Sequence, residues 1–382
     1  MLSRWALPVA VLIVSILQAE FIMGVPQAGS HFHHQRRGHL SSRPSTPSSA
    51  PGTNTTKPSA NTTSPTQDTS SSGSGKCSRI RIRKEWRKMS RQEQTDYTTA
   101  VKCLIVKPSK LMPGGAYRRY DDFENVHSRM RNKIHWIASF LPWHRHFMFL
   151  WEQALQTECG YKGNLPRWDW TLDSDDMTLS PVWSADPQTG FGTNGKDFTK
   201  DPSKLGGGAI EDGAFANLQL YYPDEHTLER NYNLPQEFVQ DGRTWGSQFF
   251  DAPAMARVHA KTAYPDFAVA VEGFDPDKGD TSFVSAHSII HAIIGGDLSP
   301  TSYAANEVLF YLHHTNIDWH WATWINANRR TRLTAYGGIT KRGTTVNNAK
   351  LSDPLTYLNL GPNPTVRDTM DTTAYPYCYD YE

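Results

Sequence analysis

Histidines recur inside apolar, helix-forming segments of this chain, and this pattern limits the folds open to it. The segment SFLPWHRHFMFLWEQAL, residues 139–155, places His144 among bulky apolar side chains. In HSIIHAII, His287 and His291 are four residues apart, so on a helix they project from one face. Burying such a polar ring costs free energy unless its nitrogens find partners. The chain must therefore fold so that these rings share partners in its interior.

Two sets of three histidines can be drawn from the two halves of the chain. A single buried histidine is more often a hydrogen-bonded core residue than a ligand, so the interpretation depends on the sets. Carboxylates do not interrupt either set, which disfavours di-iron and calcium, whereas imidazoles suit copper or zinc and paired three-ligand sites favour copper. A zinc protease needs Glu after its first histidine, where this chain has Ser288. The first set is His127, His135 and His144, and the second is His287, His291 and one of the neighbouring pair His313 and His314.

Capping signals predict three helices in the first half of the domain. The first spans residues 90–106 and opens with a Ser-x-x-Glu capping box. The second begins at Asp121 or Asp122 and carries the first histidine of its set. The third spans residues 142–158, with a proline in its first turn and a glycine just beyond its end. His135 then falls in the connection between the second and third helices.

Two more helices are predicted in the second half. Thr281 or Ser282 can cap the helix that carries the His-x-x-x-His pair, and the glycines at 295–296 end it. The last helix spans residues 305–326. The stretch from 160 to 280 is rich in Gly, Pro and Asp and is predicted to be mostly loops. The expected fold is mainly α, with a central four-helix bundle that holds the metal site, long loops and few short strands.

The N-terminal part of the chain differs in composition from the rest. Residues 1–24 combine a charge, a short apolar run and a small-residue cleavage site, as in a secretory signal peptide. Residues 25–76 are rich in Ser, Thr and Pro, carry glycosylation sequons at Asn54 and Asn61, and are predicted to be a disordered linker. Residues 77–382 are left as one large domain.

Net charge and cysteine content limit the possible binding partners and the cellular compartment of the protein. A net charge of +1 gives no basis for a nucleic-acid or acidic-polymer partner. No stretch after the signal is long and apolar enough for a membrane helix, so we expect a secreted, extracellular protein with no membrane partner. The four cysteines, an even number in an exported chain, predict two disulfides without choosing among the three pairings.

Several segments together resemble the tyrosinase and catechol oxidase family, the type-3 dicopper polyphenol oxidases. FENVHSRMRNKIHWIASFLPWHRHFMFLWE resembles the first copper segment of that family, and HSIIHAIIGGDL followed by LFYLHHTNID resembles the second. LPRWDW and the tyrosine-rich YPYCYDY near the end agree with it. The resemblance covers residues 77–382 and is closest to the short, secreted fungal-type enzymes. It implies two copper ions per chain, held by the six histidines of the two sets.

The resemblance also implies roles for residues around the ligands. It selects His314 rather than His313 from the histidine pair, and leaves His146 and His226 as neighbours. Asp318, one turn beyond His314, is implied to hold the proton of a ligand ring. Glu152 is implied to act near the metal site or, equally, in a salt bridge between packed helices. The expected substrate-pocket residues are Ser288, Ala292 and Thr301, with Thr301 as a small gate over the second copper.

The resemblance implies a secreted enzyme that oxidises o-diphenols (catechols) to o-quinones, with dioxygen reduced to water. Departures from the family pattern make monophenol hydroxylation the second choice. The Asn that often follows the first histidine of the second segment is Ser288, and Lys278 and Gly279 stand where a water-positioning Glu is expected. Arg167 replaces a Tyr of the family, and Trp319 replaces an Arg.

Two functions of a different class would use the same residues. A hemocyanin-like oxygen binder would keep both copper sites but needs a cover over the pocket, and a copper-free structural relative would not need all six histidines. The chain ends shortly after the tyrosine-rich motif, so we expect no C-terminal shielding domain. The physiological phenol and the oligomeric state are left open.

Overall fold

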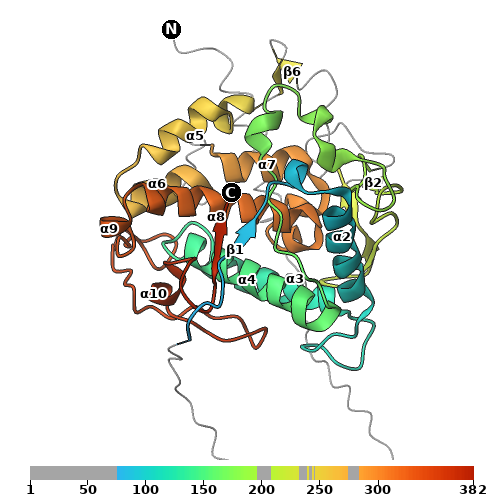
Figure 1. Cartoon of the computed structure of the whole chain (residues 1–382), viewed down its shortest axis with the longest axis horizontal. Helices are drawn as coiled ribbons and strands as arrows, with labels where there is room; N and C mark the ends of the chain where they lie inside the picture. Colours follow the sequence, from blue (N-terminus) through green and yellow to red (C-terminus); the bar gives the residue numbers. More distant parts are fainter. Residues whose placement is uncertain (1–74, 196–207, 232–238, 241–242, 245, 274–283) are drawn as a thin grey trace, which may run out of the picture. The chain divides into compact units, whose positions relative to one another are not determined.

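The computed structural model describes residues 75–195, 208–231, 239–240, 243–244, 246–273 and 284–382 (Figure 1). The predicted signal peptide and nearly all of the predicted linker lie outside the described residues, as do Thr281, Ser282, Lys278 and Gly279. Among the described residues, no helix combines the length and the apolar character needed to cross a bilayer.

Helices make up most of the regular structure, which confirms the predicted fold class. The long helices are α2 (Arg91–Val106), α3 (Arg119–Met130), α4 (Phe140–Cys159) and α8 (Leu309–Ala327). The shorter ones are α5 (Ala252–His259), α6 (Tyr264–Glu272), α7 (Ala286–Ile294), α9 (Arg329–Arg332) and α10 (Val366–Thr369).

The predicted helix boundaries hold in part. The capping box at the start of α2 is present, since the Ser90 amide donates to Glu93 Oε2 at 2.8 Å. The predicted start of α3 at Asp121 or Asp122 is wrong, because Asp121 lies in the first turn and accepts the Arg118 amide at 2.6 Å. Ser285, not an earlier residue, caps α7. α8 begins at Leu309, four residues later than predicted, because a 3₁₀ turn occupies 304–306.

The core of the domain lies where α2, α3, α4 and α8 pack together (Figure 1). Aromatic rings fill the space between these helices. Trp151 of α4 stacks on Tyr311 of α8, with ring centroids 3.7 Å apart, and Phe123 of α3 meets the same indole edge-on at 4.8 Å. Such rings bury large apolar areas and hold three helices in a fixed relation. The histidines borne by α3, α4 and α8 therefore rest on a rigid frame.

The strands are few and short, as predicted, and each described sheet has two strands. β1 (Arg81–Arg83) pairs in parallel with β8 (Tyr379–Tyr381), so the two ends of the domain lie side by side (Figure 1). The other pairs are antiparallel. They are β2 (Gly208–Ala209) with β5 (Glu229–Arg230), β3 (Gln219–Leu220) with β4 (His226–Thr227), and β6 (Val239–Gln240) with β7 (Arg243–Thr244).

Two disulfides use all four cysteines, and the structure supplies the pairing that the sequence left open. Cys77 is bonded to Cys378, which joins the segments leading into β1 and β8. Cys103 of α2 is bonded to Cys159 at the end of α4. A cross-link that closes a long loop restricts the unfolded chain most, so the first bond contributes to holding the two ends of the domain together.

Candidate metal centre

The first set of histidines forms one buried cluster. His127 comes from α3, His144 from α4, and His135 from the connection between these helices, as predicted. One ring nitrogen from each lies within 4.8 Å of the others, a spacing that a single metal ion can bridge. Three separate parts of the first half of the domain thus point imidazoles at one place.

The second set converges in the same way but includes one more ring. His287 and His291 project from one face of α7, and both His313 and His314 of α8 lie against them. A ring nitrogen from each of the four residues lies within 4.8 Å of the others. Membership of this cluster does not separate His313 from His314, so the choice of His314 remains a prediction.

The two clusters lie in direct contact, and apolar rings border both of them. The rings of His144 and His314 stack with centroids 4.5 Å apart and an interplanar angle of 14°. Phe140 lies 4.7 Å from His144 and 4.8 Å from His287, so it borders both clusters. Phe310 does the same from α8, at 4.1 Å from His314 and 5.0 Å from His127. The aromatic wall limits water around both sets of rings.

Main-chain carbonyls fix the orientation of four of these rings. In each, Nδ1 lies at hydrogen-bonding distance from a carbonyl oxygen, so Nδ1–H donates and the lone pair stays on Nε2. This is the arrangement that presents Nε2 to a metal. The pairs are His135 with Arg131 (2.9 Å), His144 with Phe140 (2.8 Å), His287 with Glu272 (3.2 Å) and His291 with Leu298 (2.6 Å).

The opposite nitrogens lack hydrogen-bond partners although they are buried. Within the part of the chain that the structure describes, Nε2 of His144, His287 and His291 has no such partner. The same holds for both ring nitrogens of His313 and His314, whereas the His127 ring contacts the main chain of Thr301. Buried polar atoms are nearly always hydrogen-bonded, so a group of unpartnered imidazole nitrogens in one place is suited to coordinating a metal ion.

Burial also keeps these rings in the form that binds metals. It lowers the pKa of His135 to about 3 and that of His291 to about 4. The pKa values of His127, His144, His287, His313 and His314 fall well below 6.5, first because of burial and then because neighbouring imidazoles oppose a second charge. At neutral pH all seven rings are therefore uncharged, which is the form in which an imidazole can bind a metal.

The donor set fits a pair of copper ions. Both clusters described here consist of imidazoles alone, without a carboxylate. Neutral nitrogen donors suit copper and zinc, whereas magnesium and calcium require oxygen donors. The residues present therefore match the metal that the sequence resemblance implied.

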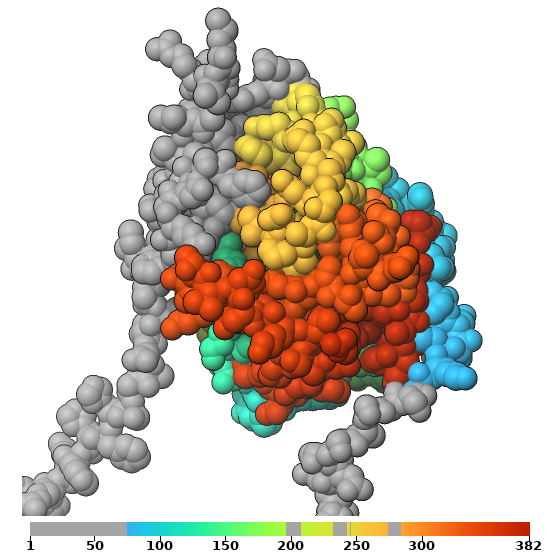
Figure 2. All heavy atoms as spheres, turned by 90° about the vertical axis from the view of Figure 1, so that its left-hand side faces the viewer, coloured from blue at the N-terminus to red at the C-terminus, as the bar shows by residue number. Residues whose placement is uncertain are grey.

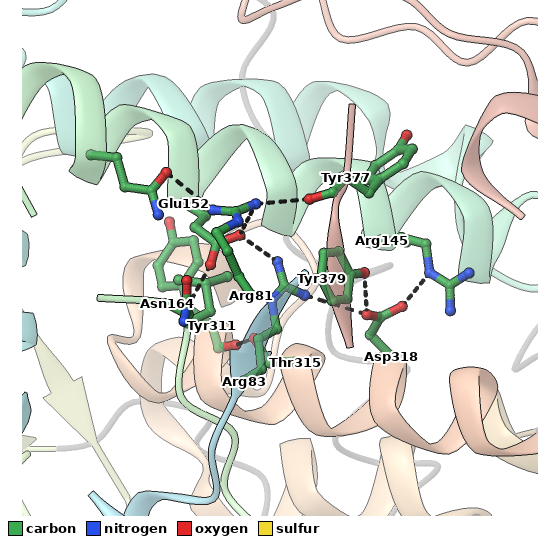
Figure 3. Close-up of polar contacts among 12 residues, drawn as sticks. Arg81, Arg83, Arg145, Glu152, Asn164, Tyr311, Thr315, Asp318, Tyr377 and Tyr379 are labelled. Atoms are coloured by element: carbon green, nitrogen blue, oxygen red, sulfur yellow. Dashed lines mark hydrogen bonds and ion pairs between the residues drawn. The ribbon is translucent and has the colours of Figure 1, made fainter. Parts of the chain in front are cut away.

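Asp318 does not have the predicted contact with a ligand ring. Its Oδ1 accepts from Arg145 Nε at 2.5 Å, and its Oδ2 accepts from the hydroxyl groups of Tyr379 (2.6 Å) and Tyr381 (2.5 Å) (Figure 3). Arg83 Nη1 lies 3.4 Å from the same Oδ2. The prediction was wrong because a carboxylate one turn beyond His314 on α8 faces the arginine next to His144 on α4, away from the imidazoles.

Glu152 takes the salt-bridge role that the sequence left as one of two possibilities. Its Oε2 accepts from Arg83 Nη2 at 2.8 Å, and its Oε1 accepts from the Leu165 amide at 2.9 Å (Figure 3). Both side chains of the ion pair are fully buried. Glu152 therefore ties α4 to β1 and stabilises the frame behind the clusters.

Arg167 and Trp319, two departures from the family pattern, contact each other. The Arg167 guanidinium carbon lies 4.3 Å above the centroid of the Trp319 ring. The same guanidinium donates to Asn316 Oδ1 at 2.9 Å and pairs with Asp169 at 3.0 Å. The family pattern has a Tyr at position 167 and an Arg at position 319. This chain has the cation at 167 and the aromatic ring at 319, so the two side chains can still form a cation–π contact. The departures thus form one coupled pair.

The three predicted pocket residues lie near the clusters, in different ways. Ser288 and Ala292 are half-buried on α7, next to the two histidines of that helix. Ser288 Oγ is engaged by Ser285, whose amide lies at 3.2 Å. The main chain of Thr301 contacts the His127 ring of the first cluster, and its role as a gate over the second copper stays a prediction.

Glu272 is a buried residue that the sequence pattern did not reveal, and it contacts the second cluster through its main chain. Its main-chain oxygen holds His287 Nδ1, and its Oε1 accepts from the Trp136 amide at 2.7 Å. It lies farther upstream of His287 than the family's spacing would place such a residue. Its position at the end of a short apolar helix, α6, was the available signal.

His226 forms a charge pair close to the second cluster. Its Nε2 donates to Asp297 Oδ1 at 2.8 Å, and its Nδ1 donates to the Asp224 carbonyl at 2.9 Å. Burial by itself would lower the pKa of His226, but the hydrogen bond and charge of Asp297 outweigh it and raise the pKa to about 9. Asp297 directly precedes Leu298, whose carbonyl orients His291.

The His226–Asp297 pair predicts a pH dependence of stability. Because the folded-state pKa of about 9 exceeds the ordinary 6.5, the stabilisation is complete below pH 6.5 and is lost as pH rises through 9. The loss should amount to about 3 kcal/mol in the free energy of unfolding. Urea unfolding across this range should show it, and His226→Gln should flatten the curve. An unchanged slope in that variant would contradict the assignment.

Comparisons with known proteins agree with this geometry. Residues 117–327 match the common central domain of tyrosinase. The tyrosinase-like protein phomQ1 of Diaporthe leptostromiformis is 34% identical over 319 residues, covering 80% of this chain and 78% of that protein. The N-acetyl-6-hydroxytryptophan oxidase ivoB of Emericella nidulans is 30% identical, covering 79% and 92%. The structure of a mutant polyphenol oxidase from Thermothelomyces thermophila has a TM-score of 0.64 at 26% identity, covering 79% of this chain and 89% of that one.

The matched domain spans both histidine clusters and all the helices that carry them. The fold and the site thus define an α-helical protein with two facing imidazole clusters. The chain belongs to the tyrosinase family.

Proposed function

We propose that the chain binds one copper ion in each cluster and oxidises o-diphenols to o-quinones, with dioxygen reduced to water. The observation that carries the proposal is the pair of facing clusters whose buried ring nitrogens lack hydrogen-bond partners among the described residues. The proposed ligands are His127, His135 and His144 for one ion, and His287, His291 and His314 for the other. Copper, when bound, supplies the one-electron redox steps that link a diphenol to dioxygen.

The protein contributes orientation, ligand neutrality and a dry pocket. Carbonyl oxygens hold four Nδ1–H groups, so the rings need little reorganisation when metal binds. Burial keeps the rings uncharged, and Phe140 and Phe310 border the clusters with apolar surface. Small side chains at Ser288, Ala292 and Thr301 leave room for a flat aromatic ring next to the ligands. No nucleophilic side chain is required.

Hydroxylation of monophenols is the second candidate, and Glu272 is the observation that favours it. A monophenol must lose its proton before it can bind a metal, and a carboxylate next to the ligands can accept that proton. Glu272 is buried, its main-chain oxygen holds His287 Nδ1, and its carboxylate accepts from the amide of Trp136, the residue after His135. The relative named N-acetyl-6-hydroxytryptophan oxidase supports hydroxylated aromatic amino acid derivatives as substrates to include in the test.

Oxygen uptake by copper-loaded protein tests the proposal. With 4-methylcatechol we expect immediate oxygen consumption and quinone absorbance, and with tyramine a much slower reaction. Fast turnover of tyramine without a priming catechol would reverse the order of the two candidates. Reversible oxygen binding without quinone would indicate an oxygen carrier, and less than one copper per chain after reconstitution would contradict the dicopper assignment.

A further inference from the structure

Two more histidines lie close together outside both clusters. His259 ends α5 and is half-buried, whereas His320 belongs to α8 and is fully buried. Nε2 of His259 and Nδ1 of His320 are 3.0 Å apart. The other nitrogen of His320, Nε2, is buried and has no hydrogen-bond partner among the described residues. The two rings are hydrogen-bonded to each other, whereas His320 Nε2 is buried without the partner that such an atom nearly always has.

His259 and His320 lie between the surface of the domain and the second cluster. α5 contributes to the face of the domain seen in Figure 2 (yellow) and packs against α8. His320 and His313 are seven residues apart on α8, so they share one face two turns apart. Both border the Trp170 ring, with centroids 5.1 Å and 6.4 Å from it.

His313 is the innermost of three histidines that follow one another from the surface to the second cluster. Its ring lies 5.5 Å from His287 and 5.0 Å from His291 between centroids, inside the four-histidine cluster. Both of its nitrogens are buried without a hydrogen-bond partner among the described residues, although three other rings suffice for one copper ion. Imidazoles are therefore spaced from the surface to the second metal site, in the order His259, His320, His313.

The surroundings of His259 and His320 favour transient over permanent binding of a metal ion. Burial and then the nearby Arg332 charge lower the pKa of His259, and burial, His259 and then Arg167 lower that of His320. Both rings are uncharged at neutral pH and can bind a metal, while the two arginines disfavour a resident cation. A relay must bind an ion well enough to accept it and weakly enough to release it, as in ion-conducting sites.

We propose that His259 and His320 form an entry site for copper, from which His313 passes the ion to the second histidine cluster. His320 and His313 are about 10 Å apart along α8, so the ion is released from His320 before His313 binds it, and its charge does not change. The inference rests on the proposed dicopper function. It also gives His313 a role that differs from that of its neighbour His314, because His313 carries copper during loading and is not required to hold it afterwards.

The test measures how fast the metal-free full chain takes up copper. Cu(I) in acetonitrile under argon is added, samples are quenched with bathocuproine, and protein-bound copper is counted over time. A His144→Ala background restricts uptake to the second cluster. His259→Ala removes the outer ring, and His320→Phe keeps the ring stacked on Trp170 without its nitrogens. His146→Phe is the matched control, because His146 is buried but bonded to Tyr377 and Pro362.

We expect uptake to slow by roughly tenfold or more in the His259 and His320 variants, as for other residues that support a metal site, with the final copper content unchanged. The control should load at the parent rate. Unchanged rates in both variants would overturn the inference. If His320→Phe unfolds at a lower temperature than the parent chain, His320→Gln is used in its place. A parent chain that binds no copper, or loaded wild-type protein that produces no quinone, would contradict the proposed function instead.

Discussion

His314→Ala is expected to remove the second copper ion and abolish diphenol oxidation. The ring of His314 stacks on His144 across the two clusters, and neither of its nitrogens has a hydrogen-bond partner among the described residues. Removing a residue that only supports a ligand costs about 10–100-fold in metal affinity or activity, so loss of a ligand should exceed about 100-fold. Copper content at equilibrium and oxygen uptake with 4-methylcatechol measure the two effects.

His313→Ala is the matched control for that result. His313 precedes His314 on α8, is equally buried and belongs to the same cluster. We expect this variant to retain both copper ions at equilibrium, even though the entry proposal predicts slow loading. The two predictions are compatible because one concerns the final state and the other the rate. If His313→Ala loses copper at equilibrium and His314→Ala does not, the assignment of the ligand is reversed.

Asp318→Ala is expected to cause the largest loss of stability among single changes outside the clusters. Asp318 neutralises Arg145 and Arg83, which are fully buried, and accepts hydrogen bonds from Tyr379 and Tyr381 (Figure 3). Removing it leaves two buried guanidinium groups with less compensating charge, a change that costs about 3–5 kcal/mol when one partner of a buried pair is lost. Urea unfolding of the variant and the parent measures the difference.

The same variant should also weaken copper binding. Arg145 directly follows His144 on α4, and Asp318 lies one turn beyond His314 on α8, so their ion pair fixes the spacing of the two clusters. Asp371→Ala is the control, since its pair with Arg329 is more than a quarter exposed on each side and should contribute less than about 1 kcal/mol. Equal losses in the two variants would show that burial of the Asp318 network has little effect.

The two histidine clusters could be predicted from the sequence in part, because the spacing within each set is local. His287 and His291 share a helix face whatever surrounds them, and the capping signals located α2 and the end of α4 within a residue or two. The start of α8 was placed too early, because a 3₁₀ turn and a helix have similar apolar patterns. Such boundaries depend on contacts with the rest of the domain, which local propensity does not contain.

The role of Asp318 could not be predicted in the same way. Its position one turn beyond His314 suggested a contact with an imidazole, but its partners come from α4, β1 and β8, which are remote in sequence. Glu272, His259 and His320 were missed for the same reason. Each lies near a cluster or a second histidine only because α5, α6, α7 and α8 pack together. A side chain's partners across an interface follow from packing, not from its own segment.

The amino-acid sequence alone determined the family resemblance, the mainly helical fold and the two sets of imidazoles, because helical periodicity and spacing are properties of short segments. Only the tertiary structure decided which cysteines pair, which carboxylates support arginines, and which nitrogens remain without partners. These depend on distances between segments far apart in the chain, and such distances are set by the packing of the whole domain.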